Sequence, residues 1–213
     1  AFKEAGYEAV TFGQKTYNGV AILSRHPMRD VVRNIPGHTD EQARVIAATM
    51  DTPAGELRLV NCYFVNGQAP GTDKFAYKML WLTALHRWLR EELLAHPRLA
   101  LVGDFNVAPE DRDSFDPVGL KDTIHHTVEE RQHFQDLIAL GLTDTFRMFE
   151  QPEKSYSWWD YRMLGFQKNR GLRIDHILVS EALRASVTAC TIDRAPRKNP
   201  QPSDHAPVVL TMA

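Results

Sequence analysis

Short apolar runs separated by polar, turn-forming segments recur along the whole chain. Most runs are too short for helices and several are rich in Val and Ile, so they predict strands. The predicted strands lie at 10–12, 20–23, 44–50, 57–65, 99–102, 177–179, 187–193 and 208–210. Turn signals such as Asn18-Gly19 separate them. Because predicted strands outnumber predicted helices, the pattern indicates an α/β protein with layered sheets.

Two segments have the spacing of three and four that is typical of an amphipathic helix. The clearer one spans 73–95, with Asp73 as its expected N-cap. Its apolar positions are Phe75, Met79, Leu82, Leu85, Leu89 and Leu93, and the neighbouring Trp81 and Trp88 widen this buried face. The second helix is expected from Thr127, which can form a capping box with Glu130, to Gly141.

The composition fits one globular domain over residues 1–213, with 43% hydrophobic and 24% charged residues. No apolar run approaches the length of a membrane span and no signal peptide is visible. We therefore expect a cytoplasmic protein without a membrane partner. Cys62 and Cys190 lack the spacing of metal ligands, and we interpret Cys62 as a buried apolar side chain. Three histidines are interpreted as solvated side chains at a helix end: His125, His126 and His133.

The charge is unevenly distributed. The whole chain has a net charge of −2, but residues 154–200 carry a net +5 and the remainder −7. The segment 156–173 also interleaves aromatic and arginine side chains, which suits the binding of unstacked bases. A basic segment beside an acidic remainder suits an enzyme that binds a polyanion and a cation.

The stretch 99–106 reads Leu-Ala-Leu-Val-Gly-Asp-Phe-Asn and combines a buried strand with polar residues at its end. If the backbone stays extended past Gly103, Asp104 and Asn106 point to the same side. Open α/β folds keep their functional sites at such strand ends. Gly, Asp and Asn equally favour a plain turn, so both interpretations stay open for this stretch alone.

Two further predicted strands each follow an acid, Asp175 in one case and Asp204-His205 in the other. Adjacent side chains of an extended chain point in opposite directions. We therefore expect His205 to pair with an acid from elsewhere, with Asp175 as the candidate, so that Asp204 can approach a metal ion. An imidazolium beside a carboxylate can face a phosphate. Asp104 can accept a proton from water, and Asn106 can donate to a phosphate oxygen.

Four motifs extend this pattern over essentially the whole chain. They are Asn-Gly-Val-Ala-Ile-Leu-Ser at 18–24, Gly-Asp-Phe-Asn at 103–106, Gly-Leu-Arg-Ile-Asp at 171–175 and Ser-Asp-His-Ala-Pro at 203–207. In this order they resemble the exonuclease III type of AP endonuclease, in the endonuclease–exonuclease–phosphatase superfamily of metal-dependent phosphoesterases. The resemblance implies a four-layered α/β sandwich of two packed mixed β-sheets flanked by helices.

The same resemblance implies a DNA repair nuclease that uses Mg²⁺, with Mn²⁺ as a substitute. It would hydrolyse the phosphodiester 5′ to abasic sites and have 3′–5′ exonuclease and 3′-phosphodiesterase activity. Its implied partner is double-stranded DNA with abasic sites or 3′ ends, and we expect a monomer.

The resemblance assigns catalytic roles to five residues. It makes Asp104 the base or the acid that orients water, and gives Asn106 and His205 contacts to the scissile phosphate. Asp175 would orient His205, and Tyr63 would assist the phosphate or the leaving group.

It assigns binding roles to five more. Asp204 would lie near the metal, and Asn66 would make a further contact to the phosphate or the site. Trp158 and Leu172 match positions that line the pocket for the base-free sugar, and Arg162 matches a position inserted into the DNA.

The start of the chain departs from the family pattern. That pattern begins with a strand ending in asparagine, then a helix and a second strand ending in the glutamate that holds the metal. Ala1 enters after that glutamate, and residues 1–7 are interpreted as the end of a helix. We therefore expect an N-terminally incomplete sandwich that by itself binds metal poorly and is nearly inactive beside its full-length parent.

Two alternative functions stay open at this point. Sphingomyelinases and phosphoinositide phosphatases share Gly-Asp-Phe-Asn and Ser-Asp-His, so another phosphoesterase of the superfamily is one alternative. The runs at 158–162 and 167–171 favour the DNA enzyme. The other alternative is a non-catalytic module that binds damaged DNA, although binding alone has little use for a proton-accepting acid or an Asp–His pair.

Overall fold

The computed structural model describes residues 2–213 and centres on a six-stranded mixed sheet. In spatial order the strands are β3 (Met28–Arg33), β4 (Val45–Thr52), β5 (Gly55–Tyr63), β6 (Leu99–Asp104), β10 (Asp175–Ser180) and β7 (Leu142–Asp144). β5 and β6 are parallel, and the other neighbouring pairs are antiparallel. Helix α1 (Asp73–Ala95) connects the parallel pair, which cannot be joined by a tight hairpin.

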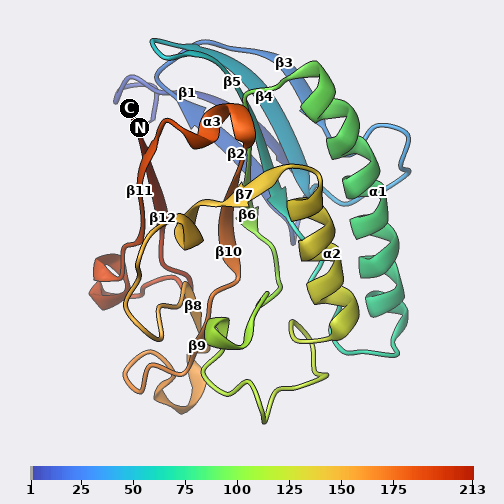
Figure 1. Ribbon diagram of the computed structural model, residues 1–213, viewed down its shortest axis with the longest axis vertical. Helices are drawn as coiled ribbons and strands as arrows, with labels where there is room; N and C mark the ends of the chain where they lie inside the picture. Colours follow the sequence, from blue (N-terminus) through green and yellow to red (C-terminus); the bar gives the residue numbers. More distant parts are fainter. Residues whose placement is uncertain (1) are drawn as a thin grey trace.

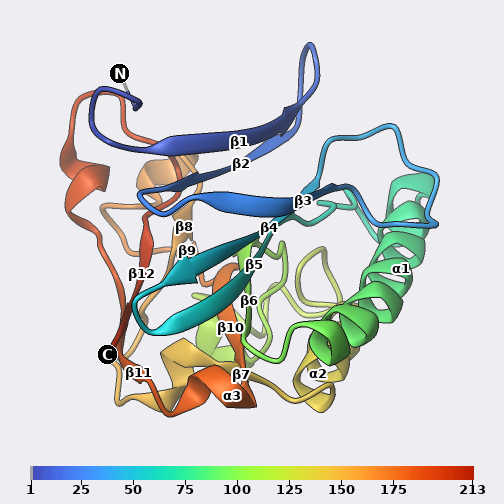
Figure 2. The same cartoon turned by 90° about the horizontal axis from the view of Figure 1, so that it is seen from above.

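Helices α1 and α2 (Val128–Ala139) cover one face of this sheet (Figures 1 and 2). The main core lies between these helices and the sheet. The predicted burial of Trp81 and Trp88 is confirmed. Thr127 caps α2 in the capping box expected from the sequence. The expected N-cap of α1 is wrong by one residue, because the Thr72 hydroxyl, and not Asp73, accepts the Phe75 N–H.

Two strand pairs lie on the opposite face of the sheet. They are β1 (Glu8–Gly13) with β2 (Gly19–Ser24), and β11 (Val187–Ile192) with β12 (Val208–Met212). Ile22 of β2 packs against Ile46 and Ala48 of β4. Residues 45–50 of β4 are consequently buried on both faces, which explains their uninterrupted small and apolar character.

Shorter elements complete the chain. They are β8 (Trp158–Trp159), β9 (Gly171–Leu172), α3 (Glu181–Arg184), and the 3₁₀ turns η1 (Asp111–Asp113), η2 (Thr145–Met148), η3 (Arg162–Leu164) and η4 (Ala195–Lys198). The expected helical end at 1–7 is wrong for residues 2–6, which form turns, and Ala1 lies outside the described residues. Among residues 2–213, none of the helices combines the length and the apolarity needed to cross a bilayer.

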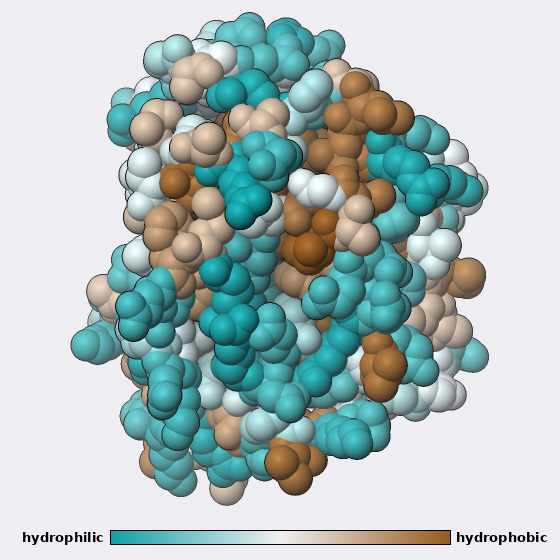
Figure 3. Space-filling view, viewed as in Figure 1, coloured by the Kyte–Doolittle hydropathy of each residue, from teal (hydrophilic) through white to brown (hydrophobic). Residues whose placement is uncertain are grey.

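The loops that follow β5 and β6 and the loop that precedes β10 gather at one end of the sheet. This end is at the bottom of Figure 1, where the aromatic segment around β8 and β9 also lies. The space-filling view shows mostly hydrophilic side chains there (Figure 3). The polar residues singled out by the sequence are carried by these loops and strand ends.

Candidate active site

Three of the predicted catalytic residues are neighbours in the central sheet. Asp104, the last residue of β6, pairs with Tyr63 at the end of β5 and with Asp175 at the start of β10. The preceding Gly103 has a φ of +137°, and a Cβ at this position would overlap the carbonyl oxygen of Cys62. Only glycine permits this backbone conformation and this close approach of the strands.

Asp104 and Asn106 come together through a turn. Asp104 Oδ1 accepts the Asn106 backbone N–H at 2.9 Å, and Oδ2 accepts from Nδ2 at 3.0 Å. Asn106 has a φ of +50°, in the left-handed region. The two side chains are therefore close together, and of the two interpretations left open the backbone follows the turn rather than the extended chain. A carboxylate that binds the amide two residues later forms a turn of its own, so the turn interpretation and the functional one hold together.

The carboxamide of Asn106 is fully hydrogen-bonded within the protein. Nδ2 also donates to the Phe64 carbonyl at 3.1 Å, and Oδ1 accepts from Asn66 Nδ2 at 3.1 Å. Asn106 thus orients Asp104 and Asn66, and its predicted contact with a phosphate stays a prediction. Asn66 is exposed, so its amide group can also reach a substrate oxygen.

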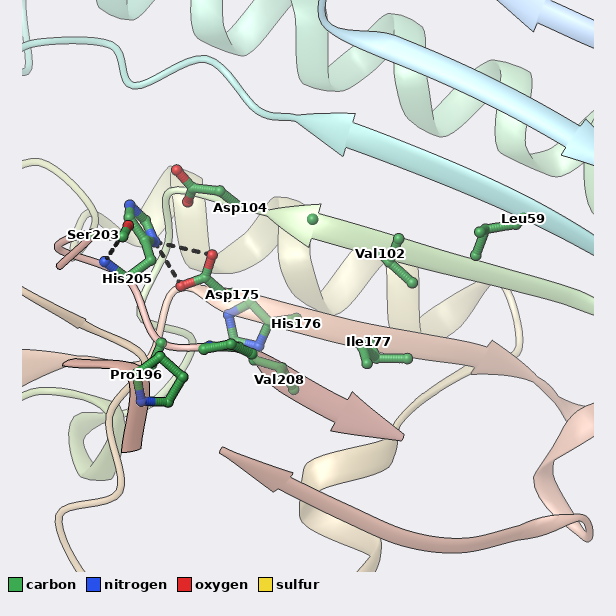
Figure 4. A pocket seen from close by; sticks show the side chains of 13 residues that line it. Leu59, Val102, Asp104, Asp175, His176, Ile177, Pro196, Ser203, His205 and Val208 are labelled. Atoms are coloured by element: carbon green, nitrogen blue, oxygen red, sulfur yellow. Dashed lines mark hydrogen bonds and ion pairs between the residues drawn. The ribbon is translucent and has the colours of Figure 1, made fainter. Parts of the chain in front are cut away.

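Asp175 and His205 form the expected pair, which confirms their association. The Asp175 carboxylate oxygens lie 2.9 and 3.1 Å from His205 Nδ1 (Figure 4). The Asp175 backbone N–H is itself bound to Ser157 Oγ at 3.0 Å. Burial opposes a charged imidazole, but the hydrogen bond and charge of Asp175, with further carboxylates nearby, raise the pKa of His205 to about 9. His205 is therefore an imidazolium at neutral pH.

The pKa values of Asp104 and Tyr63 are shifted in directions that suit proton transfer. Burial, followed by repulsion from Asp175, raises the pKa of Asp104 to about 7. A carboxylate with this pKa can accept a proton near neutral pH. Burial, with the charge of Asp104, also raises the pKa of Tyr63, so its hydroxyl stays a hydrogen-bond donor. The Arg44 guanidinium lies over the Tyr63 ring, 5.0 Å from its centroid.

Asp204 connects the site to the aromatic segment. Its Oδ2 accepts the Trp158 indole N–H at 2.9 Å, and its backbone carbonyl accepts the Trp159 N–H at 3.0 Å. Trp158 and His205 also form an isolated bridge between their backbones. Asp204 is thereby held beside the Asp175–His205 pair.

The described side chains suit a divalent metal in chemical type but do not form a complete site for it. Carboxylate oxygens such as those of Asp204 and Asp104 are the hard donors that Mg²⁺ prefers. Among residues 2–213, however, no three His, Cys, Asp or Glu side chains come close enough to hold a metal ion.

Two separate cavities are lined by predicted site residues, and the backbone bridge between Trp158 and His205 joins one lining residue of each. One, of about 590 Å³, is lined by Asp104, Asp175 and His205, with apolar residues further along the sheet (Figure 4). The second, of about 520 Å³, is lined by three of the four predicted substrate-binding residues, Trp158, Arg162 and Leu172, but not by Asn66. All ten predicted site residues therefore lie at one end of the sheet.

His125 is a site residue that the sequence did not reveal. Its Nδ1 lies 2.7 Å from the Asn106 carbonyl oxygen, and the side chain lines the second cavity. Burial and then the charge of Lys78 lower its pKa to about 4, so the imidazole is neutral. The prediction of solvated histidines is wrong for His125 and for the buried His126, which contacts Ser114 Oγ at 2.9 Å. No spacing in the sequence indicates these contacts.

Comparison with known proteins gives extensive matches. Residues 2–205 match the Endonuclease/Exonuclease/phosphatase family. The chain is 35% identical to exodeoxyribonuclease III of Haemophilus influenzae, covering 95% of this chain and 79% of that protein.

Two solved structures extend the likeness to the whole fold. A 3′ phosphatase from Neisseria, bound to a product DNA hairpin, is 45% identical with a TM-score of 0.95, covering 100% of this chain and 81% of that one. An AP endonuclease from Archaeoglobus fulgidus is 32% identical with a TM-score of 0.93, covering 99% and 81%. The expected α/β sandwich of two packed mixed sheets flanked by helices is confirmed by these matches.

Proposed function

The chain belongs to the endonuclease/exonuclease/phosphatase family, as a hydrolytic nuclease of the exonuclease III type, and from this premise we propose that it hydrolyses P–O3′ bonds in damaged DNA. The proposed substrates are duplexes with an abasic site, cut on its 5′ side, and duplexes with blocked or recessed 3′ ends. Both reactions leave a 3′-hydroxyl. One active site can serve both reactions, because in each of them water attacks a phosphorus atom and a 3′ oxygen leaves.

The observation that carries this proposal is the position of Asp104 at a strand end between Tyr63 and the Asp175–His205 pair. Asp104, with a pKa near neutrality, takes the proton of the attacking water. His205, charged and held by Asp175, donates to a non-bridging phosphate oxygen as negative charge grows there. The Tyr63 hydroxyl donates to the phosphate or to the leaving 3′ oxygen.

Substrate selection is assigned to the second cavity and its rim. Trp158 and Leu172 would face the base-free sugar, and Asn66 would contact the phosphate beside it. Arg162, whose side chain is 86% exposed and paired with Asp160 at the surface, would enter the DNA next to the lesion.

The family is divalent-metal-dependent, and we assign Mg²⁺ to this protein with Asp204 as a ligand from this chain. The hard carboxylate oxygens and the phosphate substrate favour Mg²⁺, with Mn²⁺ as its substitute. When bound, the ion would neutralise charge on the phosphate oxygens.

Processing of 3′ ends alone is the second candidate. It is favoured by the 45% identity with a structure described as a 3′ phosphatase. The two candidates differ only in whether an internal abasic site can enter the second cavity. Phosphatases that act on lipids or inositol phosphates, and a non-catalytic DNA-binding module, gain no support from the relatives found.

The test is cleavage of three labelled duplexes by the full-length gene product. One carries an internal abasic analogue, one a 3′-phosphate at a nick, and one is undamaged. With Mg²⁺ we expect cutting 5′ to the analogue and release of the 3′-phosphate, and neither reaction in EDTA. Asp104→Asn should lower kcat by about 10²–10⁴-fold on both substrates.

The matched control is Asp122→Asn, on an exposed turn whose left-handed φ of +58° asparagine tolerates well. It should leave both rates unchanged. Release of 3′-phosphate without cutting at the analogue would replace the first candidate by the second. Inactivity on all three duplexes, with phosphate released from a phosphoinositide or sphingomyelin, would overturn the proposal.

A further inference from the structure

Lys78 lies on α1, and its side chain extends to the loops that follow β5 and β6. Its side chain is 1% exposed, and its Nζ donates to the Asn106 carbonyl at 2.8 Å and to the Asn66 carbonyl at 3.2 Å. Its third partner is the Glu130 carboxylate, which is fully buried. An ammonium group has three hydrogens, so every donor of Lys78 is used.

Two of these three partners belong to residues that form the site. Asn66 and Asn106 are bonded to each other through their side chains, and Asn106 binds Asp104. Lys78 thus holds, through their backbone carbonyls, Asn106, whose side chain binds Asp104, and Asn66, whose side chain binds Asn106. The Asn106 carbonyl that accepts from Lys78 also lies 2.7 Å from His125 Nδ1, so this turn is held from two sides.

The backbone after Asn66 is shaped to fit the Lys78 side chain. Gly67 has a φ of +87°, and a Cβ added there would lie 2.9 Å from Lys78 Cδ. The turn therefore packs directly on the aliphatic part of the lysine. Any larger residue at this position would push the loop away from the helix.

Glu130 ties the lysine to the second helix. Its Oε2 accepts from the backbone N–H and the hydroxyl of Thr127, which is the capping box of α2. One network consequently joins the α1 side chain, the start of α2 and both site loops.

Stability alone is a poor explanation for this network. Burial lowers the pKa of Lys78, and the charge and hydrogen bond of Glu130 act against that effect. Replacing a buried ion pair by apolar residues is often neutral or stabilising, so its presence is weak evidence of a stabilising role. The geometry gives a more specific role, because an apolar side chain could fill the space but could not bind two carbonyls.

We propose that Lys78 is a positioning residue for the reaction, which fixes Asn66 and Asn106 and through them the Asp104 carboxylate. This inference rests on the proposed roles of those three residues. It assigns no contact between Lys78 and substrate.

The test uses the double variant Lys78→Met/Glu130→Gln in the full-length gene product. Removing the lysine alone would leave the Glu130 charge buried and unpaired, so that variant can fail to fold. Glutamine at 130 keeps an acceptor for Thr127. We expect kcat on the cleaved duplex to fall about 10- to 100-fold, as expected for a shift of the catalytic groups by up to about 1 Å, with KM nearly unchanged.

The second measurement does not depend on activity. The Asn106 side-chain N–H₂ should exchange with solvent at least about tenfold faster in the double variant, because its local opening becomes easier. Solvent exchange is followed by NMR with EDTA present. If the wild-type protein cuts none of the duplexes, the proposed function fails, and this exchange measurement still decides whether Lys78 positions Asn106.

The matched control is an ion pair between Arg58 of β5 and Glu92 near the far end of α1, whose side chains are 2% and 13% exposed and whose atoms lie 2.7 Å apart. Arg58→Met/Glu92→Gln removes the same charges and should leave kcat and the Asn106 exchange within about twofold of wild type, because distant sites act independently. Equal effects of the two double variants would overturn the proposal. So would a Lys78 double variant with wild-type kcat or wild-type exchange.

Discussion

The imidazole of His205 is bonded to one carboxylate and lies in the field of two others. Burial opposes its charge, and the hydrogen bond and charge of Asp175 outweigh burial, with Asp104 and Asp204 adding to the effect. Its pKa therefore rises from 6.5 to about 9. Asp175 acts on Asp104 in the same direction, because its negative charge is the second cause, after burial, of the pKa of about 7 there.

Removing the Asp175 charge should therefore lower both pKa values. In Asp175→Asn we expect the pKa of His205 to fall from about 9 towards its ordinary value of 6.5, and that of Asp104 to fall from about 7 towards 3.8. Activity that needs ionised Asp104 and charged His205 would then be confined to a more acidic window. The direct measurement is NMR titration of the His205 ring nitrogens in EDTA.

The pH dependence of protein stability should also depend on the Asp175–His205 pair. A histidine whose pKa is raised on folding contributes stability that is complete below pH 6.5 and is lost as the pH rises through about 9. The free energy of unfolding should thus decline more steeply over this interval in wild type than in Asp175→Asn. Asp122→Asn is the matched control and should follow wild type in both measurements. An unchanged His205 titration in Asp175→Asn would contradict the assignment of Asp175 as its partner.

Among single residues, the sequence revealed those whose types and motif positions match the chemistry. Asp175 and His205 could be paired in advance because adjacent side chains of a strand point apart, which excludes Asp204 as the partner of His205. Lys78 could not be found in this way, because a lysine on an amphipathic helix is usually interpreted as solvated. Its burial depends on two loops and a second helix, which no local pattern describes.

At the scale of elements, the site depends on the close spacing of β5 and β6. Gly103 of β6 is paired with Cys62 of β5, and its φ is +137°. In Gly103→Ala the new Cβ would overlap the Cys62 carbonyl, and the backbone conformation would be strained as well. We expect a loss of about 2–5 kcal/mol of unfolding free energy.

Thermal unfolding measures this loss, which corresponds to a decrease in Tm of roughly 5–15 °C for a chain of this size. Gly13→Ala in β1 is the control, because Gly13 has no positive φ and no atom within 4 Å of an added Cβ. It should change stability by less than about 0.5 kcal/mol. A Gly103→Ala variant as stable as Gly13→Ala would show that the strands can separate to accept a side chain.

The elements were predictable to the extent that local signals define them. The capping box at Thr127 and the apolar stripe of α1 identified both long helices. β3 is not predicted because the apolar residues of its sequence, Met-Arg-Asp-Val-Val-Arg, do not alternate with polar ones, and its register with β4 is irregular. The short strands β7, β8 and β9 form only through their partners in the sheet, so they have no pattern of their own.

The whole molecule carries its charge asymmetrically around the site. Residues 154–200 have a net charge of +5 in a chain of net charge −2. Some of these cations are occupied inside the protein: Arg173 is buried between Asp113 and Asp144, and Arg197 lies against aromatic rings. Arg162, Lys168 and Arg170 are exposed on the loop that borders the second cavity, Arg162 in a surface pair with Asp160 and Arg170 over the Phe115 ring. This loop is therefore well placed to meet a phosphate backbone.

Binding of duplex DNA should therefore weaken with salt in proportion to the exposed cations of this segment. Each phosphate neutralised in B-DNA contributes about 0.9 to the slope of log K against log salt concentration. Arg162→Gln/Lys168→Gln should lower the magnitude of the slope by about 1 to 2, as measured by fluorescence anisotropy with a labelled abasic duplex in EDTA. Arg29→Gln is the control, because Arg29 is bonded to Asp30, Asp51 and Glu56 near the β4–β5 turn, at the opposite end of β5 from Tyr63. If the Arg29→Gln slope falls as much as that of the double variant, DNA is attracted by the overall charge of the protein, and the basic segment does not define the binding surface.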